Sequence, residues 1–115
     1  MIPAGVDIFV AVEPIDLRCG FNRLSGMARD QLGYEPRCGA LFVFFGKRRH
    51  AVKILFFDGT GMCLFYKRLD KGTFRVPEAP DDGATHIEID EGTLDALLDG
   101  IEVEEARRVQ IRVVH

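Results

Sequence analysis

Four strand-forming apolar runs between positions 41 and 76, separated by turn residues, restrict the fold of this chain more than any other feature. Aspartate followed by glycine, as at Asp58-Gly59, is a hairpin signal when it stands between two such runs. Pro77 ends the last run because proline has no amide hydrogen to continue a ladder. The pattern predicts an antiparallel meander of four strands. The runs are Leu41 to Phe45, Ala51 to Phe57, Met62 to Leu69 and Thr73 to Val76.

Side chains alternate between the two faces of each predicted strand. In the second run this places Val52, Ile54 and Phe56 on one face. The residues between them are also mostly apolar, so both faces of the sheet should be partly buried. The third run ends in Lys67 and Arg68. We therefore expect a sheet with a buried middle and a basic rim.

The length of 115 residues and the apolar content of 47% suit one domain with an ordinary packed core. We expect a single domain over 1–115, with a basic sheet part at 6–77 and an acidic part at 78–115. No apolar run approaches the roughly 20 residues that a membrane span needs. The first residues also lack the basic start and apolar stretch of a secretory signal. The sequence predicts a soluble, cytoplasmic protein with no membrane partner.

Charge is divided unevenly along the chain. The formal net charge is −3, yet residues 17–77 hold 12 Lys and Arg against four acids, which is a local charge of +8. Residues 78–115 hold 11 acids against three Arg, which is −8. Such asymmetry indicates a surface for an anionic partner such as nucleic acid. The alternative is that these turn charges are merely solvated.

The remaining segments predict two helices and further strands, and hence an α+β fold. Apolar residues at helical spacing indicate a main helix packed on the sheet from about 21 to 32, with Gly33 as its stop. A short second helix is expected at 93–99, capped by Asp90 or Thr93. Strands are expected at 7–12, 86–89 and 109–114, an exposed connector at 78–83, and an acidic turn or helical start at 102–106. The apolar stripe of the main helix is Leu17, Phe21, Leu24, Ala28 and Leu32.

The three cysteines give no support to a metal site. Cys19, Cys38 and Cys63 are odd in number and widely spaced, without a Cys-x-x-Cys pair. We interpret them as free buried thiols and expect neither a metal nor a cofactor.

The order of motifs resembles the accessory protein of the insertion-sequence-66 transposon family, the TnpB-type second reading frame. The resemblance covers about residues 6–77: the block PIDLRCGFNRL, the strand LFVFFGKRR, and the segment KILFFDGTGMCLFYKRLDKGTFRVP. The chain departs from the family pattern at Cys19, where lysine is usual, at Asn22, where aspartate is usual, and at Val76, where tryptophan is usual. The resemblance implies a protein encoded beside a transposase that assists transposition.

Two functions follow as hypotheses. In the first, basic side chains bind backbone phosphates of the transposon ends, and an exposed aromatic such as Tyr66 stacks on an unpaired base. An aromatic residue at strand spacing is more often part of the core. In the second, the protein is an adaptor that binds the transposase and no DNA. The candidate DNA-binding residues are Arg18, Arg23, Lys47, Arg48, Arg49, Lys53, Lys67, Arg68, Lys71 and Arg75.

Catalysis is the least favoured interpretation. A metal-dependent nuclease would need carboxylates such as Asp7, Asp16 and Asp58 to converge within a few ångströms. Asp16 stands at an expected helix start and Asp58 in an expected hairpin, where aspartate has an ordinary structural role. The sequence therefore predicts no catalytic residues, and the resemblance places strand-transfer chemistry in the separate transposase.

Overall fold

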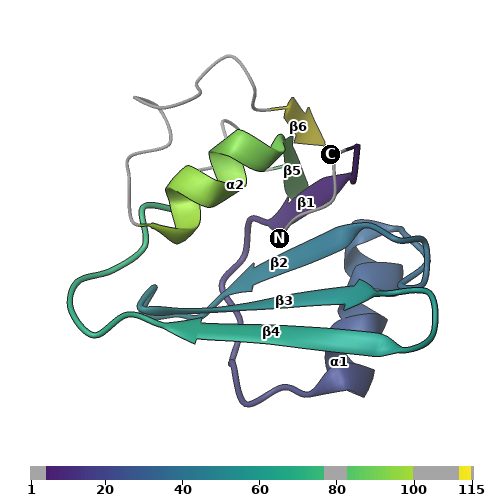
Figure 1. Ribbon diagram of the computed structural model, residues 1–115, viewed down its shortest axis with the longest axis horizontal. Helices are drawn as coiled ribbons and strands as arrows, with labels where there is room; N and C mark the ends of the chain where they lie inside the picture. The colour runs from purple at the N-terminus through teal and green to yellow at the C-terminus, as the bar shows by residue number, and fades with distance from the viewer. Residues whose placement is uncertain (1–4, 77–82, 100–111, 115) are drawn as a thin grey trace.

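The computed structural model describes residues 5–76, 83–99 and 112–114 (Figure 1). Its elements are β1 (Ile8–Ala11), α1 (Phe21–Met27), the π-helical turn η1 (Ala28–Leu32), β2 (Leu41–Phe45), β3 (Ala51–Phe57), β4 (Met62–Arg68), β5 (His86–Ile89), α2 (Glu91–Leu98) and β6 (Arg112–Val114). The predicted α+β class, with a mostly antiparallel sheet, a main helix and a short C-terminal helix, is confirmed.

The strands form one sheet in the order β4-β3-β2-β1-β5-β6. β1 and β2 run parallel, and the other neighbouring pairs are antiparallel. Parallel neighbours require a long crossover connection. The segment between β1 and β2, which contains α1, provides this crossover. The hairpin strands β3 and β4 pair over seven residues, from Ala51 opposite Arg68 to Phe57 opposite Met62.

One helix packs on each face of the sheet, as Figure 1 shows. Strand alternation sends Val52 and Ile54 to the face that packs on α2, and Leu55 to the face that packs on α1. The α1 side is closed by part of the predicted stripe: Leu24, Ala28 and Leu32 are buried, whereas Phe21 is 46% exposed. The core on the α2 side contains Ile8, Val10, Leu41, Val43, Phe45, Val52, Ile54, Phe74, Ile87, Ile89, Leu94 and Leu97.

The helix boundaries reflect local chain chemistry. The main helix begins at Phe21, as predicted, and ends at Gly33, whose φ of 86° is a left-handed conformation that glycine adopts without strain. Its last turn widens to a π-helix, which the sequence pattern did not indicate. The second helix begins at Glu91 because the Asp90 side chain accepts a hydrogen bond of 2.7 Å from the Thr93 amide.

The predicted fourth strand of the meander is wrong. Residues 73–76 form no strand, because the turn at Gly72, with a φ of 75°, redirects the chain and places Phe74 in the core against the Phe45 ring, 5.5 Å away. The meander therefore consists of β2, β3 and β4. Of the predicted last strand, 112–114 is confirmed, whereas 109–111, the acidic segment 102–106 and most of the connector at 78–83 lie outside the described residues.

The three cysteines are free thiols, but the prediction that they are buried is wrong. Cys38 is exposed, and Cys19 and Cys63 are half-buried. Among the described helices, none is long and apolar enough to cross a bilayer.

Candidate nucleic-acid interface

A polar cleft of about 570 Å³ lies between the β2–β3 turn and the loop that leads into α1. The backbone brings these segments together, because Ile15 forms a parallel bridge with Gly46 and its amide donates to the Phe45 carbonyl at 2.9 Å. A Cβ at Gly46 would stand 2.8 Å from Leu17 Cδ1, so glycine permits the close approach. The cleft is lined by Ile15, Asp16, Leu17, Arg18, Gly46, Lys47, Arg48, His50, Ala51 and Tyr66.

Three of the predicted DNA-binding residues, Arg18, Lys47 and Arg48, line this cleft. Arg18 is held by Asp16: its Nη2 lies 2.6 Å and its Nε 3.1 Å from Asp16 Oδ2. These hydrogen bonds hold the pKa of the Asp16 carboxyl well below its ordinary value. The Asp16 carboxylate offsets the charge of Arg18, and in the described part of the chain neither Lys47 nor Arg48 forms an ion pair.

Tyr66 forms part of the cleft wall, and 52% of its surface is exposed. It lies on the edge strand β4 opposite Lys53 of β3. The Lys53 ammonium donates a 2.8 Å hydrogen bond to the Cys19 carbonyl and stands 5.6 Å from the centre of the Tyr66 ring. The cation thus supports one side of the aromatic ring. Because β4 is an edge strand, no further strand lies beside it to cover this ring. Strand spacing does not show which strand is at the edge, and so the sequence alone favoured a core position for Tyr66.

The β2–β3 turn and the chain that leaves β4 lie at the same end of the sheet (Figure 1), and most of the other basic residues of the hairpins belong to these two segments. The Leu69 amide donates to the His50 carbonyl at 2.8 Å, and the Phe74 amide donates to the Arg49 carbonyl at 2.6 Å. These hydrogen bonds place segment 69–75 beside the turn. The exposed basic residues of this end are Lys47, Arg48, Arg49, Arg68, Lys71 and Arg75; we call them, together with Arg18, the basic end.

Lys67 and Arg23 belong neither to the cleft nor to the basic end. Lys67 is on the face of the sheet opposite Tyr66, and its ammonium donates a 2.8 Å hydrogen bond to the Leu98 carbonyl at the end of α2. Arg23 is exposed on α1 and is not among the residues that line the cleft. Sequence reasoning missed Ile15 and His50 as cleft residues. The cleft forms only where the bridge between Ile15 and Gly46 joins two segments that are distant in the sequence.

Two of the aspartates considered for catalysis, Asp16 and Asp58, serve local structure. Asp58 Oδ1 accepts hydrogen bonds from the amides of Thr60 and Gly61, both at 2.9 Å, which closes the β3–β4 turn and lowers the pKa of Asp58 to about 2. Asp16 is engaged with Arg18. In the described part of the chain, no three His, Cys, Asp or Glu side chains are grouped closely enough to hold a metal ion.

Comparison with known proteins assigns the chain to a family. The pattern of the family described as IS66 Orf2 like protein matches residues 6–108. An uncharacterized protein of Sinorhizobium fredii (strain NBRC 101917 / NGR234), y4hO, is 41% identical over 104 residues, which are 89% of this chain and 88% of the relative. A second from the same strain, y4jC, is 35% identical over 108 residues, 94% of this chain and 90% of the relative. No solved structure matches the chain. The chain therefore belongs to the IS66 Orf2-like family and is tied to insertion-sequence-66 elements.

Proposed function

We propose that the protein is a non-catalytic accessory factor of transposition that contacts DNA through its basic end and assists a separate transposase. One observation carries this proposal: the fold brings Arg18 to the consecutive residues Lys47 and Arg48 in one cleft, beside a half-exposed Tyr66. The partners are then the DNA of the transposon ends and the transposase of the same element.

The chemistry of the cleft suits a nucleic-acid backbone. Lysine and arginine bind phosphate oxygens and supply affinity without base specificity. A half-exposed tyrosine ring beside such a groove offers a stacking surface to an unpaired base, which is worth about 1–3 kcal/mol per base. We therefore expect the protein to prefer DNA with unpaired bases at the position of Tyr66, such as a single strand or an opened end.

The test is fluorescence anisotropy of labelled transposon-end duplex, scrambled duplex and single strand, repeated across a salt series. Binding that weakens steeply with salt supports phosphate contacts. We expect Lys47→Ala with Arg48→Ala to reduce the slope of log K against log salt concentration by about two, because two phosphate contacts are lost. The matched control is Arg29→Ala with Arg37→Ala, which removes the same charge from exposed positions outside the cleft.

Tyr66→Ser separates stacking from phosphate contact. It should weaken binding of the single strand by about 1–3 kcal/mol and leave duplex binding nearly unchanged. Absence of DNA binding at low salt would contradict the proposal and favour the alternative of an adaptor that binds the transposase directly. Equal loss of affinity in the cleft variant and its control would show that net charge, and not the cleft, attracts the DNA.

A further inference from the structure

Among the described residues, no helix lies over the β3–β4 side of the sheet face that carries α2. Six strands about 4.8 Å apart make a sheet roughly 29 Å wide, whereas a helix is about 10 Å in diameter. Leu94 and Leu97 of α2 are buried in the core on this face. On the neighbouring strands β3 and β4, Phe56 and Cys63 are only half-buried. In the described part of the chain, the cover over this face thus thins out toward β4.

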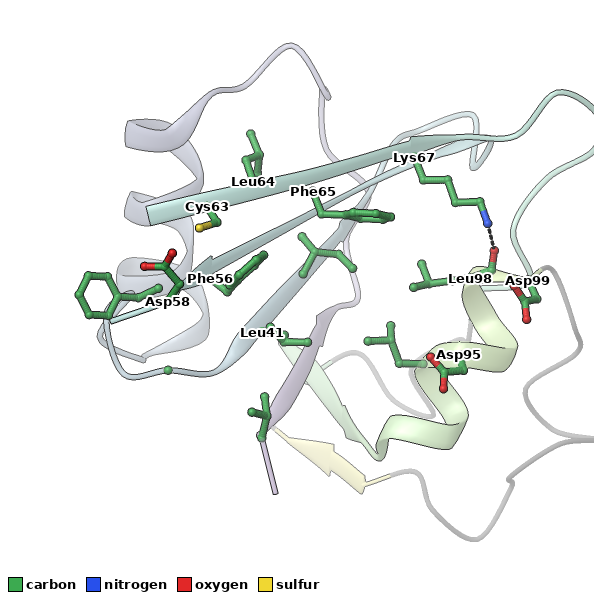
Figure 2. Close-up of a pocket in the computed structure, with 15 residues that line it drawn as sticks. Leu41, Phe56, Asp58, Cys63, Leu64, Phe65, Lys67, Asp95, Leu98 and Asp99 are labelled. Atoms are coloured by element: carbon green, nitrogen blue, oxygen red, sulfur yellow. Dashed lines mark hydrogen bonds between the residues drawn. The ribbon is translucent and has the colours of Figure 1, made fainter. Parts of the chain in front are cut away.

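This side of the face forms an apolar groove of about 1000 Å³ between α2 and the β3–β4 hairpin (Figure 2). Phe56 and Phe65 line its hairpin side, and Leu98 lines its α2 side. Phe65 is 43% exposed, although it is a large apolar residue. A contiguous exposed apolar surface of this kind marks an interaction site in soluble proteins.

The rim of this groove is acidic. Asp95 and Asp99 lie one turn apart on α2, and Asp58 stands at the hairpin end. Among the described residues that line the groove, the one cation is Lys67, which already donates to the Leu98 carbonyl at 2.8 Å. No cation among the described residues pairs with Asp95 or Asp99. An occupant with positive charge beside its apolar surface would therefore match both features of the groove.

We propose that this groove binds an amphipathic helix of a partner protein, with an apolar stripe seated on Phe56 and Phe65 and with Lys or Arg beside Asp95 and Asp99. A helix packed next to α2 would complete the helical layer that the sheet face lacks. A helix with a narrow apolar stripe and a basic flank has the shape and charge that the groove selects. This inference does not depend on DNA contact, because the groove and the cleft that contains Tyr66 lie on opposite faces of β4.

The probe is an 18-residue synthetic helix with Leu at i, i+3, i+4 and i+7 and Lys along both flanks, titrated as a fluorescent peptide. We expect it to bind the full chain, and a peptide with Glu in place of Lys to bind at least tenfold more weakly. Phe65→Ser should weaken binding of the Lys peptide at least tenfold. The matched control is Tyr66→Ser, which changes the adjacent exposed aromatic residue on the other face of β4. It should change the affinity for the Lys peptide less than twofold.

Charge reversal tests the rim. Asp95→Lys with Asp99→Lys should weaken binding of the Lys peptide at least tenfold, and lysine near a helix C-terminus is compatible with the fold. Asp30→Lys with Asp70→Lys changes the net charge equally at exposed sites outside the groove and should have less than a twofold effect. Equal affinity for the Lys and Glu peptides, or unchanged affinity in Phe65→Ser, would overturn the proposal. So would self-association in sedimentation that Phe65→Ser abolishes, because a second copy would then occupy the groove.

Discussion

Arg49 combines a strained backbone with a position in the basic end. In the described part of the chain, Arg49 is the single non-glycine residue with a positive φ, which is 60°. The left-handed conformation costs an ordinary residue about 1–2 kcal/mol, and such strain is often retained where the side chain is used. Arginine at this position is therefore better explained by a function of its side chain than by the geometry of the turn.

Replacing Arg49 with glycine should separate these two effects. Glycine relieves the backbone strain but loses about 0.5–1 kcal/mol through its greater freedom in the unfolded chain. We expect Arg49→Gly to leave the free energy of unfolding unchanged or to raise it by up to about 1 kcal/mol, while the affinity for DNA falls. Urea denaturation and anisotropy measure the two quantities. A clear loss of stability would show instead that the arginine side chain supports the turn.

His86 makes the stability depend on pH. Only 1% of it is exposed, its Nε2 lies 3.0 Å from the Tyr34 hydroxyl, and its Nδ1 lies 2.8 Å from the Thr85 hydroxyl. Burial lowers the pKa of His86 from its ordinary value of 6.5. Below that pH the unfolded chain binds more protons than the folded chain, so stability is lost as the pH falls. Urea denaturation between pH 7 and pH 5 should show this decline, and His86→Gln should flatten it.

At the level of single side chains, the sequence predicted part of the site. Lys47 and Arg48 were identifiable because they follow a strand directly and a turn leaves them exposed. The position of Arg18 across the cleft depends on the bridge between Ile15 and Gly46, which no local pattern contains. The exposure of Tyr66 depends on β4 being the edge of the sheet, and alternation along one strand does not show which strand lies at the edge.

At the level of elements, local chemistry predicted most of the fold. The Asp58-Gly59 turn, the apolar stripe of α1 and the Asp90 cap each act within a few residues, and each was recognisable. The fourth strand failed for a tertiary reason: the ring of Phe74 is buried against Phe45, so the segment turns back over the sheet instead of extending it. The parallel place of β1 beside β2 likewise depends on a crossover that strand patterns do not specify.

Lys67 joins β4 to α2 and is an element-scale contact. Its ammonium cancels part of the partial negative charge at the helix C-terminus through the Leu98 carbonyl, as the dashed line in Figure 2 shows. We expect Lys67→Ala to lower the free energy of unfolding by about 1 kcal/mol with little effect on DNA affinity. Arg68→Ala, at the next position and exposed on the other face, should show the reverse. Matching results for the two variants in chemical denaturation and anisotropy would contradict this division.

Ile54 tests the register of the central hairpin. It is 5% exposed, pairs with Val43 on one side and Phe65 on the other, and faces the α2 layer. Ile54→Asp places an unpaired charge in that core, which costs several kcal/mol. We expect loss of the cooperative thermal transition in circular dichroism. Arg68→Asp, at an exposed position of the neighbouring strand β4, is the control and should keep the transition; an unchanged melt for Ile54→Asp would refute the register.

For the whole molecule, the fold turns the charge division of the sequence into separate surfaces. The basic end gathers cations from positions 18 to 75, whereas the carboxylates of α2 border the apolar groove on the other face of β4. A small protein with a net charge of −3 can therefore attract an anion and a cation at once, because screening at physiological salt confines each field to about 8 Å. Function should then depend on where charge is removed more than on how much.

Transposition measured in cells tests this dependence on location. Arg48→Glu with Arg49→Glu reverses two charges at the basic end, and we expect it to abolish transposition while the thermal melt stays close to wild type, because exposed turn charges contribute little stability. Arg29→Glu with Arg37→Glu makes the same change in net charge at exposed positions beyond the basic end and should retain activity. If the folded basic-end variant transposes like wild type, the phosphate contacts assigned to this turn are not required. If both variants fail, the long-range field of the protein matters and the cleft geometry does not.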